Sequence, residues 1–262
     1  MIRLIACDID GTLLQNGQEM LPPELHALIR QLEDRGTAFC VASGRQFSNL
    51  YELFGPSAGR IHYVCENGAL VFAGGSSGEP LEKTVLSGAL IRDLAAAIAA
   101  RPECEILFSG LNTSYLMLKD PASLPKIRPY LGSRIVTVDR VEQVDDEIVQ
   151  ISAFCQPDTA RPYEALSPVW SDRLNVTVAG EHWIDFSCAS KGAGLERLCR
   201  ELEIAPDEIM AFGDNFNDVS MLDLVGCPVI MENAPEPLRA RYAVHCGNVV
   251  EMLRDSLAAG DL

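Results

Sequence analysis

Residues 2–12 read Ile-Arg-Leu-Ile-Ala-Cys-Asp-Ile-Asp-Gly-Thr. The first six form a largely apolar run typical of a buried strand, and two carboxylates, Asp8 and Asp10, follow directly at its end. Ligands and catalytic groups in open α/β sheets gather at the carboxyl ends of strands, where a carboxylate can bind a cation or act as a covalent nucleophile. An Asp-x-Asp-Gly turn can also simply cap a loop with its own side chains. The motif alone therefore leaves a catalytic and a structural role equally open.

The chain that follows alternates between helix and strand patterns. Apolar residues at helical spacing from Leu21 to Leu32 follow two prolines and end before Gly36, and residues 37–42 form another strand-like run. Strand, helix and strand in this order predict a βαβ unit. We expect it to continue as a helix over roughly residues 45–54, a strand over 62–65, an Asn67-Gly68 hairpin turn and a strand over 69–72.

The pattern changes after a glycine and serine cluster at residues 74–78. Up to about residue 187 we expect helices over 88–100 and 158–166, and short strands over 113–118, 147–154, 174–178 and 182–186, an order typical of α+β domains. From Lys191 the α/β rhythm returns, with helices over 191–202 and 215–222, strands over 208–212 and 228–231, and a last strand and helix. The sequence thus predicts an α/β fold. Its doubly wound, parallel-sheet (Rossmann-like) core comprises residues 1–81 and 188–262, and an inserted α+β domain comprises residues 82–187.

Composition limits the classes of function. The 262 residues are 48% apolar, enough for a substantial core, and carry a net charge of −16. That charge argues against binding to nucleic acid or to an anionic membrane surface, so an anionic substrate needs a local positive site. The nine cysteines contain no C-x-x-C pair and the four histidines no H-x-x-x-H pair, so a zinc site has little support. The longest apolar run, residues 94–100, is too short to span a bilayer, and we expect a cytoplasmic protein.

A second acidic cluster, Gly213-Asp214-Asn215-Phe216-Asn217-Asp218, also follows a predicted core strand. By itself it would be a turn and a helix start. Two such clusters at strand ends can converge, and oxygen ligands from Asp8 and Asp214 suit a hard cation such as Mg²⁺.

Two further segments could bind an anion. Ser43-Gly44-Arg45 follows the second predicted strand and is expected to open a helix, so its hydroxyl and the free N–H groups of that helix could cradle a phosphate, although an ordinary N-cap serine fits equally. Lys191-Gly192 begins a helix just after the insertion. In so acidic a chain, a cation next to a phosphate would be valuable.

These four segments, in this order, resemble the four motifs of the haloacid dehalogenase (HAD) superfamily, and the chain is similar to Cof-like phosphatases with a type IIB cap over essentially its whole length. The matching residues are Asp8-x-Asp10-Gly11-Thr12, Ser43-Gly44-Arg45, Lys191-Gly192 and Gly213-Asp214-x-x-Asn217-Asp218, with Asn67-Gly68-Ala69 and Asn233-Ala234 as further familiar fragments. The resemblance implies a HAD-like core, residues 1–81 and 188–262, and a cap, residues 82–187, that governs substrate choice.

The resemblance also implies the chemistry. Asp8 would be the nucleophile that forms an aspartyl-phosphate, and Asp10 would protonate the leaving group and then deprotonate water. Mg²⁺ would be held by the Asp8 carboxylate, the Asp10 carbonyl and Asp214, with Asp218 orienting metal-bound water. Ser43, Gly44, Lys191 and Asn217 would bind the substrate phosphate. Since alternate strand residues point the same way, the chain must leave regular β geometry near Ile9 or Gly11 to separate the two carboxylates.

The resemblance implies a phosphorylated small molecule as the partner, with no nucleic acid or membrane, and a monomer or weak homodimer. A phosphomutase on sugar phosphates and a non-catalytic regulator that binds a phosphometabolite remain alternatives. Residues 180–183, Gly-Glu-His-Trp, could meet a substrate or pack a hairpin. Ser43 stands where threonine is common in the family, Glu232 stands where glycine is usual, and residues 245–248 replace a segment that is often acidic, which puts auxiliary loop contacts in doubt.

Overall fold

A computed structural model describes residues 1–15, 17–74, 79–131, 134–260 and 262. One sheet has the strand order β14-β13-β12-β1-β2-β3-β4-β5. Its strands are β1 (Leu4–Cys7), β2 (Ala38–Ala42), β3 (His62–Cys65), β4 (Leu70–Phe72), β5 (Glu82–Lys83), β12 (Ile209–Gly213), β13 (Cys227–Met231) and β14 (Val244–Cys246). Pairing is parallel from β14 to β3, and β4 and β5 add antiparallel strands at the edge. The expected parallel sheet and the Asn67-Gly68 hairpin are confirmed.

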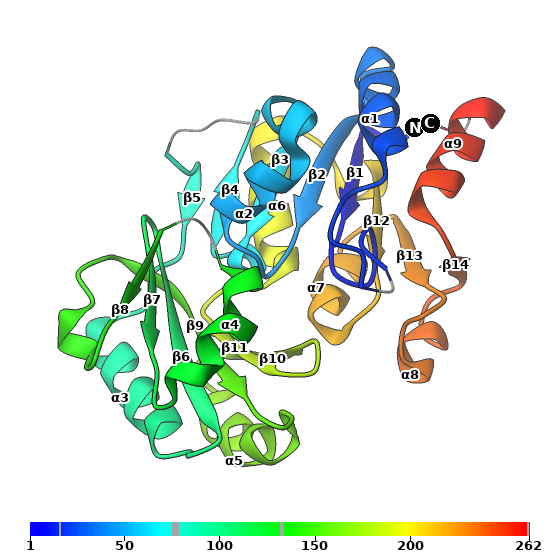
Figure 1. Ribbon diagram of the computed structural model, residues 1–262. Helices are drawn as coiled ribbons and strands as arrows, with labels where there is room; N and C mark the ends of the chain where they lie inside the picture. The colour runs from blue at the N-terminus through cyan, green and yellow to red at the C-terminus, as the bar shows by residue number, and fades with distance from the viewer. Residues whose placement is uncertain (16, 75–78, 132–133, 261) are drawn as a thin grey trace.

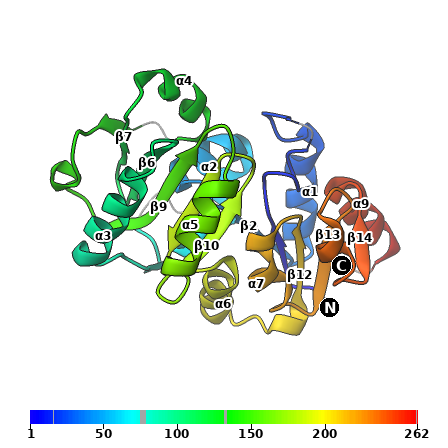
Figure 2. The same ribbon diagram turned by 90° about the horizontal axis from the view of Figure 1, so that it is seen from below.

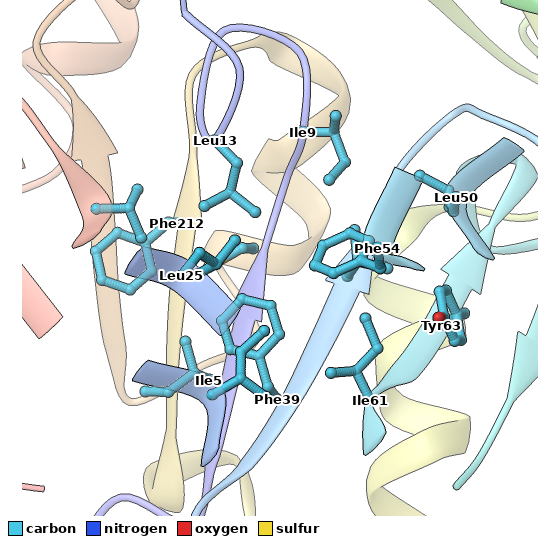
Figure 3. Close-up of a cluster of buried hydrophobic side chains, with 14 of the residues drawn as sticks. Ile5, Ile9, Leu13, Leu25, Phe39, Leu50, Phe54, Ile61, Tyr63 and Phe212 are labelled. Atoms are coloured by element: carbon cyan, nitrogen blue, oxygen red, sulfur yellow. The ribbon is translucent and has the colours of Figure 1, made fainter. Parts of the chain in front are cut away.

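Helices cover both faces of this sheet (Figures 1 and 2). They are α1 (Pro23–Asp34), α2 (Phe47–Phe54), α6 (Lys191–Leu202), α7 (Val219–Leu222), α8 (Glu236–Arg239) and α9 (Val249–Ala259). One apolar cluster joins α1, α2 and α9 to one face, and Figure 3 shows part of it around Phe39, Phe54 and Phe212. A second cluster joins α6, α7 and α8 to the opposite face. The sheet is therefore doubly wound, and its strands are buried on both sides, as a parallel sheet requires.

The second sheet has the order β10-β11-β9-β6-β7-β8 and lies beside the first in both views (Figures 1 and 2). Its strands are β6 (Cys104–Gly110), β7 (Ser114–Met117), β8 (Ile135–Thr137), β9 (Ile148–Cys155), β10 (Asn175–Ala179) and β11 (Trp183–Ser187), and its helices are α3 (Gly88–Ala99), α4 (Leu124–Ile127) and α5 (Ala160–Trp170). All of its pairs are antiparallel except β7 with β8. Among the described helices of the chain, none is long and apolar enough to cross a bilayer.

Alternation of side chains gives the second sheet two different faces. On the central strands, one set of alternate residues, including Ile106, Ile151 and Ile184, packs in the cluster with α3 and α5. The other set includes polar residues that are also buried, namely Ser109, Gln150, Ser152 and Asp185. This polar face is the one that lines a cavity against the first sheet.

The structure differs from the sequence expectations in several places. We did not predict β6 or β8, and α2 begins at Phe47 instead of near residue 45. The expected helix over residues 215–222 is a 3₁₀ turn, Phe216–Asp218, followed by the single turn α7. Strand β5, which we assigned to the insertion, pairs with β4 of the first sheet. The domain limits at residues 82 and 187 stay a prediction, and most of the cluster at 74–78 lies outside the described residues.

Candidate active site

A buried lysine joins the two acidic clusters. Asp8 continues the line of β1, and its backbone N–H donates to Phe212 O at 3.0 Å. Lys191 is the first residue of α6, and its Nζ lies 2.6 Å from Oδ1 of both Asp8 and Asp218. Lys191 is 1% exposed, so this lysine is buried although it stands at the start of a helix. Burial would lower the pKa of Lys191, but Asp218 and Asp8 outweigh this and raise it above its usual value.

The position of Lys191 depends on close packing of α6. Ser190 caps this helix, with its Oγ accepting from Ala193 N at 3.2 Å. Gly68 lies against this cap, at φ +94°, where a Cβ would come within 2.0 Å of the Ser190 carbonyl oxygen. Only glycine allows this approach and this left-handed backbone together. The turn after β3 therefore fixes the start of α6 beneath Asp8.

Asp8, Asp214 and Asp218 form a cluster that suits a hard cation. One carboxylate oxygen of each lies within 4.8 Å of the others. Three carboxylates against the single Lys191 ammonium leave the cluster with a charge of −2 when all are ionised. Burial raises the pKa of Asp8, with smaller contributions from the neighbouring aspartates, and burial and Asp218 raise the pKa of Asp214 to about 6. The excess charge and the all-oxygen donor set fit a divalent ion such as Mg²⁺.

Each member of the cluster is held by further contacts. Asp218 Oδ2 accepts from the N–H groups of Asp214 and Asn215, at 2.9 and 3.0 Å. Thr12 Oγ1 donates to Asp214 Oδ1 at 3.3 Å. Because both oxygens of Asp218 already accept hydrogen bonds, Asp214 and Asp8 are the freer carboxylates of the three.

Asp10 points away from this cluster. The chain turns at Gly11, whose φ is +92° and whose missing Cβ would come within 2.2 Å of Asp214 Oδ2. Asp8 is buried, whereas the Asp10 side chain is 54% exposed and accepts a two-pronged ion pair from Arg45, with Nε and Nη2 at 2.7 and 2.6 Å. The expected break in β geometry therefore occurs at Gly11, and the two carboxylates have different surroundings. Arg45 had been assigned no role from the sequence.

Ser43 and Gly44 lie between β2 and α2, but not as expected. Since Gln46 is the N-cap residue of α2, Ser43 is not at the helix terminus, and its Oγ instead accepts from Arg45 N at 3.2 Å. Ser43 is 2% exposed. A Cβ on Gly44 would lie 3.1 Å from Asn67 Nδ2, so the backbone at Gly44 approaches this amide closely.

Asn67 links the two sheets. Its Nδ2 donates to Gln150 Oε1 at 2.9 Å and to Asp185 Oδ2 at 2.8 Å, both on the polar face of the second sheet. Its Oδ1 accepts from Asn217 Nδ2 at 3.2 Å. Sequence reasoning treated Asn67 as a turn residue and missed this bridge.

A cavity of about 300 Å³ lies between the sheets, and five of the expected site residues line it. Asp8, Asp10, Ser43, Gly44 and Asn217 line it from the first sheet, and Lys191, Asp214 and Asp218 lie behind Asp8. Residues 180–183 line it as well, and Trp183 also packs on Phe154, with ring centroids 4.9 Å apart. Trp183 therefore has the packing role, and contact between this segment and a substrate stays a prediction.

Glu66 is a cavity residue that sequence reasoning did not single out. It is 2% exposed, and burial, with a further contribution from Asp185, raises its pKa to about 8. The sequence signal was a glutamate between a buried strand and an Asn-Gly turn, where a solvated loop residue is the usual reading.

The residues that depart from the family pattern lie beside the Gly11 turn. Asn233 Nδ2 donates to Gly11 O at 2.9 Å, and Gln15 Nε2 donates to Gly247 O at 3.1 Å. Asn248 caps α9, with its Oδ1 accepting from Val250 N and Glu251 N. Glu232 N donates to Cys246 O at 2.9 Å. The altered 245–248 segment thus supports the loop after β1 and the start of α9.

Comparisons with known proteins cover nearly the whole chain. A family model of haloacid dehalogenase-like hydrolases matches residues 5–249. A 5-amino-6-(5-phospho-D-ribitylamino)uracil phosphatase of Escherichia coli is 29% identical over 254 residues, covering 94% of this chain and 91% of that protein. A pyridoxal phosphate phosphatase of the same organism is 25% identical, covering 94% and 93%. The solved structure of a HAD subclass IIB sugar phosphatase has a TM-score of 0.83 at 20% identity, covering 99% of this chain and all of that one. This last likeness confirms the fold class.

Proposed function

Because this chain belongs to the haloacid dehalogenase-like hydrolases, we propose that it is an Mg²⁺-dependent phosphatase that hydrolyses small organic phosphate monoesters through an aspartyl-phosphate. Similar proteins that carry the names of phosphatases of small phosphorylated metabolites support this reaction class. The observation that carries the proposal is the separation of the two carboxylates. Asp8 is buried and pairs with Lys191, whereas Asp10 is exposed and pairs with Arg45.

In the first step a carboxylate oxygen of Asp8 attacks phosphorus. A bond forms between that oxygen and phosphorus, and the ester bond to the leaving group breaks on the opposite side. Lys191 holds the attacking carboxylate in place. Its ammonium carries three hydrogens, of which two bond Asp8 and Asp218, and we propose that the third bonds a phosphoryl oxygen.

Asp10 supplies and recovers the proton. In its acid form it protonates the departing oxygen, and as a carboxylate it then takes a proton from the water that attacks the aspartyl-phosphate. This second attack releases inorganic phosphate and restores the Asp8 carboxylate. Arg45 holds the Asp10 carboxylate at the cavity wall and orients it.

The remaining site residues position the phosphate. Ser43 presents a hydroxyl, Gly44 places its backbone in the cavity wall beside the Asn67 amide, and Asn217 is oriented by its bond to Asn67. An Mg²⁺ ion would be held by Asp8, the Asp10 carbonyl and Asp214, with Asp218 behind them, and when bound it offsets charge on the phosphoryl oxygens.

A phosphate-release assay across metabolite phosphates, with and without Mg²⁺, tests this proposal. Asp8→Asn should abolish turnover while thermal unfolding stays close to that of the wild type. Asp223→Asn, which alters a surface ion pair with Arg241, is the matched control and should keep full activity. Wild-type rates from Asp8→Asn, or full activity after exhaustive chelation, would contradict the proposal.

The phosphomutase alternative uses the same first step but returns the phosphoryl group to substrate. Inorganic phosphate release without isomerised sugar phosphate separates the two. A non-catalytic regulator would instead be stabilised by phosphosugars against heat without releasing phosphate.

A further inference from the structure

Glu66 is buried in a way that costs free energy. It occupies left-handed backbone at φ +49°, followed by Asn67 at +52°, in the turn between β3 and β4. Its Oε2 has no hydrogen-bond partner among the described residues. A left-handed non-glycine residue costs about 1–2 kcal/mol and an unsatisfied buried polar atom about 1–3 kcal/mol. Costs of this kind persist where the side chain serves a ligand.

Glu66 lines the cavity together with residues of the second sheet. The groups that affect its ionisation are Asp185, Ser109 and Gln46, and all of them line the same cavity as Glu66. The residues proposed to bind the phosphate lie around Asp8, on the other side of the bond that is cleaved. Glu66 is therefore positioned toward the leaving group and not toward the phosphate.

The charges around this end of the cavity are acidic. Glu66, Glu181 and Asp185 line it, and Arg45, the one lysine or arginine among the described lining residues, is paired with Asp10. The wall also contains the hydroxyl groups of Ser109 and Ser152, apolar surface from Leu107, and the side chains of Gln150, His182 and Trp183. A second anionic group on a substrate would lie close to these carboxyl groups, whereas a hydroxyl could donate to them.

We propose that Glu66 hydrogen-bonds a hydroxyl group of the leaving group and so selects uncharged, hydroxyl-bearing organic phosphates over those with a second anionic group. This inference rests on the proposed phosphatase activity. Glu66 acts as a specificity residue and takes no part in bond making or breaking. Asn67, the next residue, bonds Gln150 and Asp185 and so fixes the wall that Glu66 faces.

The test compares three substrates in Mg²⁺: sorbitol 6-phosphate, which is rich in hydroxyls, 3-phosphoglycerate, which adds a carboxylate, and p-nitrophenyl phosphate, which has neither. Glu66→Leu fills the same space without polar atoms and should fold, because it removes an unsatisfied group. We expect its kcat/KM for sorbitol 6-phosphate to fall about fivefold to tenfold, the value of a hydrogen bond between uncharged groups, because the raised pKa keeps Glu66 protonated near neutral pH. Its kcat/KM for p-nitrophenyl phosphate should stay within about threefold of wild type, and that for 3-phosphoglycerate should rise. Glu66→Gln should recover part of the loss on sorbitol 6-phosphate.

Glu105→Gln is the matched control, since Glu105 is also buried but accepts from Asp120 N and Ser123 Oγ, at 3.1 and 3.2 Å. It should lower stability and leave the preference among the substrates unchanged. Equal loss on all three substrates in Glu66→Leu, or no loss on sorbitol 6-phosphate, overturns the role of Glu66 alone. Absence of phosphate release from p-nitrophenyl phosphate by the wild type overturns the proposed function together with it.

Discussion

Replacing Lys191 by methionine should destabilise the protein strongly. The change keeps the length of the side chain but removes the cation from between Asp8 and Asp218, whose carboxylate oxygens lie 2.6 Å from Nζ. The side chains of Lys191 and Asp218 are 0% exposed and that of Asp8 is 7% exposed, so water cannot replace the lost partner. Breaking a buried ion pair from one side costs about 3–5 kcal/mol, because it leaves an uncompensated charge. For a chain of this size that lowers the melting temperature by roughly 6–20 °C.

Thermal unfolding in the presence of a chelator measures this effect. Lys83→Met is the matched control, because Lys83 pairs with Glu147 on the surface, where an ion pair contributes at most about 1 kcal/mol. Adding Asp218→Asn to Lys191→Met should recover part of the loss, since it removes one of the two stranded charges. A melting temperature for Lys191→Met within about 2 °C of the wild type would refute the reasoning.

Three further predictions concern other residues. Gly68→Ala should cost about 1–3 kcal/mol by overpacking against the Ser190 carbonyl, and should reduce turnover by shifting the start of α6. Asp10→Asn should lower kcat about 10²-fold to 10⁴-fold on alkyl phosphates and less on p-nitrophenyl phosphate, whose leaving group needs no proton. Burial raises the pKa of Glu66 to about 8 in the folded protein, so between pH 5 and 8 the folded state holds a proton that the unfolded state has released. Stability of the wild type relative to Glu66→Gln should therefore fall as pH rises through this range, by at most about 1.4 kcal/mol per pH unit.

Each of these three predictions has a control variant or an outcome that would contradict it. Gly59→Ala, with nothing within 4 Å of the added carbon, should change stability by less than about 0.5 kcal/mol, and a similar result for Gly68→Ala would contradict the packing argument. Equal losses on both substrate classes in Asp10→Asn would argue against its role as the acid. A constant difference between wild type and Glu66→Gln from pH 5 to 8 would show that folding does not raise the pKa of Glu66.

The convergence of Asp8, Lys191 and Asp214 could be predicted because each follows or starts an element with a clear pattern. Helix α6 begins at Lys191 as expected, and β1 and β12 pair in parallel, so their carboxyl ends meet at one edge of the sheet. What the sequence did not reveal is burial, since a lysine at a helix start is ordinarily solvated. Burial here comes from packing between α6, the 66–68 turn and α7, which are distant in sequence.

Strand β6 and the role of Glu66 could not be predicted for a related reason. The central strand of the second sheet carries Glu105 and Ser109 within its seven residues, and its pairing with β9 is non-local. The polarity of both residues indicates a loop. The contacts that bury them come from other segments and cannot be recognised from the local sequence. Asn67 similarly gives a strong turn signal, while its amide contacts depend on where the second sheet lies.

The position of β1 has a consequence for synthesis of the protein. Its neighbours in the sheet are β2, about thirty residues later, and β12, which begins at Ile209. At about 5–20 residues per second, Lys191 leaves the ribosome roughly 10–40 s after Asp8. Throughout that interval the nascent chain can complete β6 to β11. It still lacks the Lys191 ammonium that pairs with Asp8, and it lacks β12, the strand that ends just before Asp214. Asp8 and Asp10 of the proposed site are therefore synthesised well before Lys191 and Asp214, the residues that complete it.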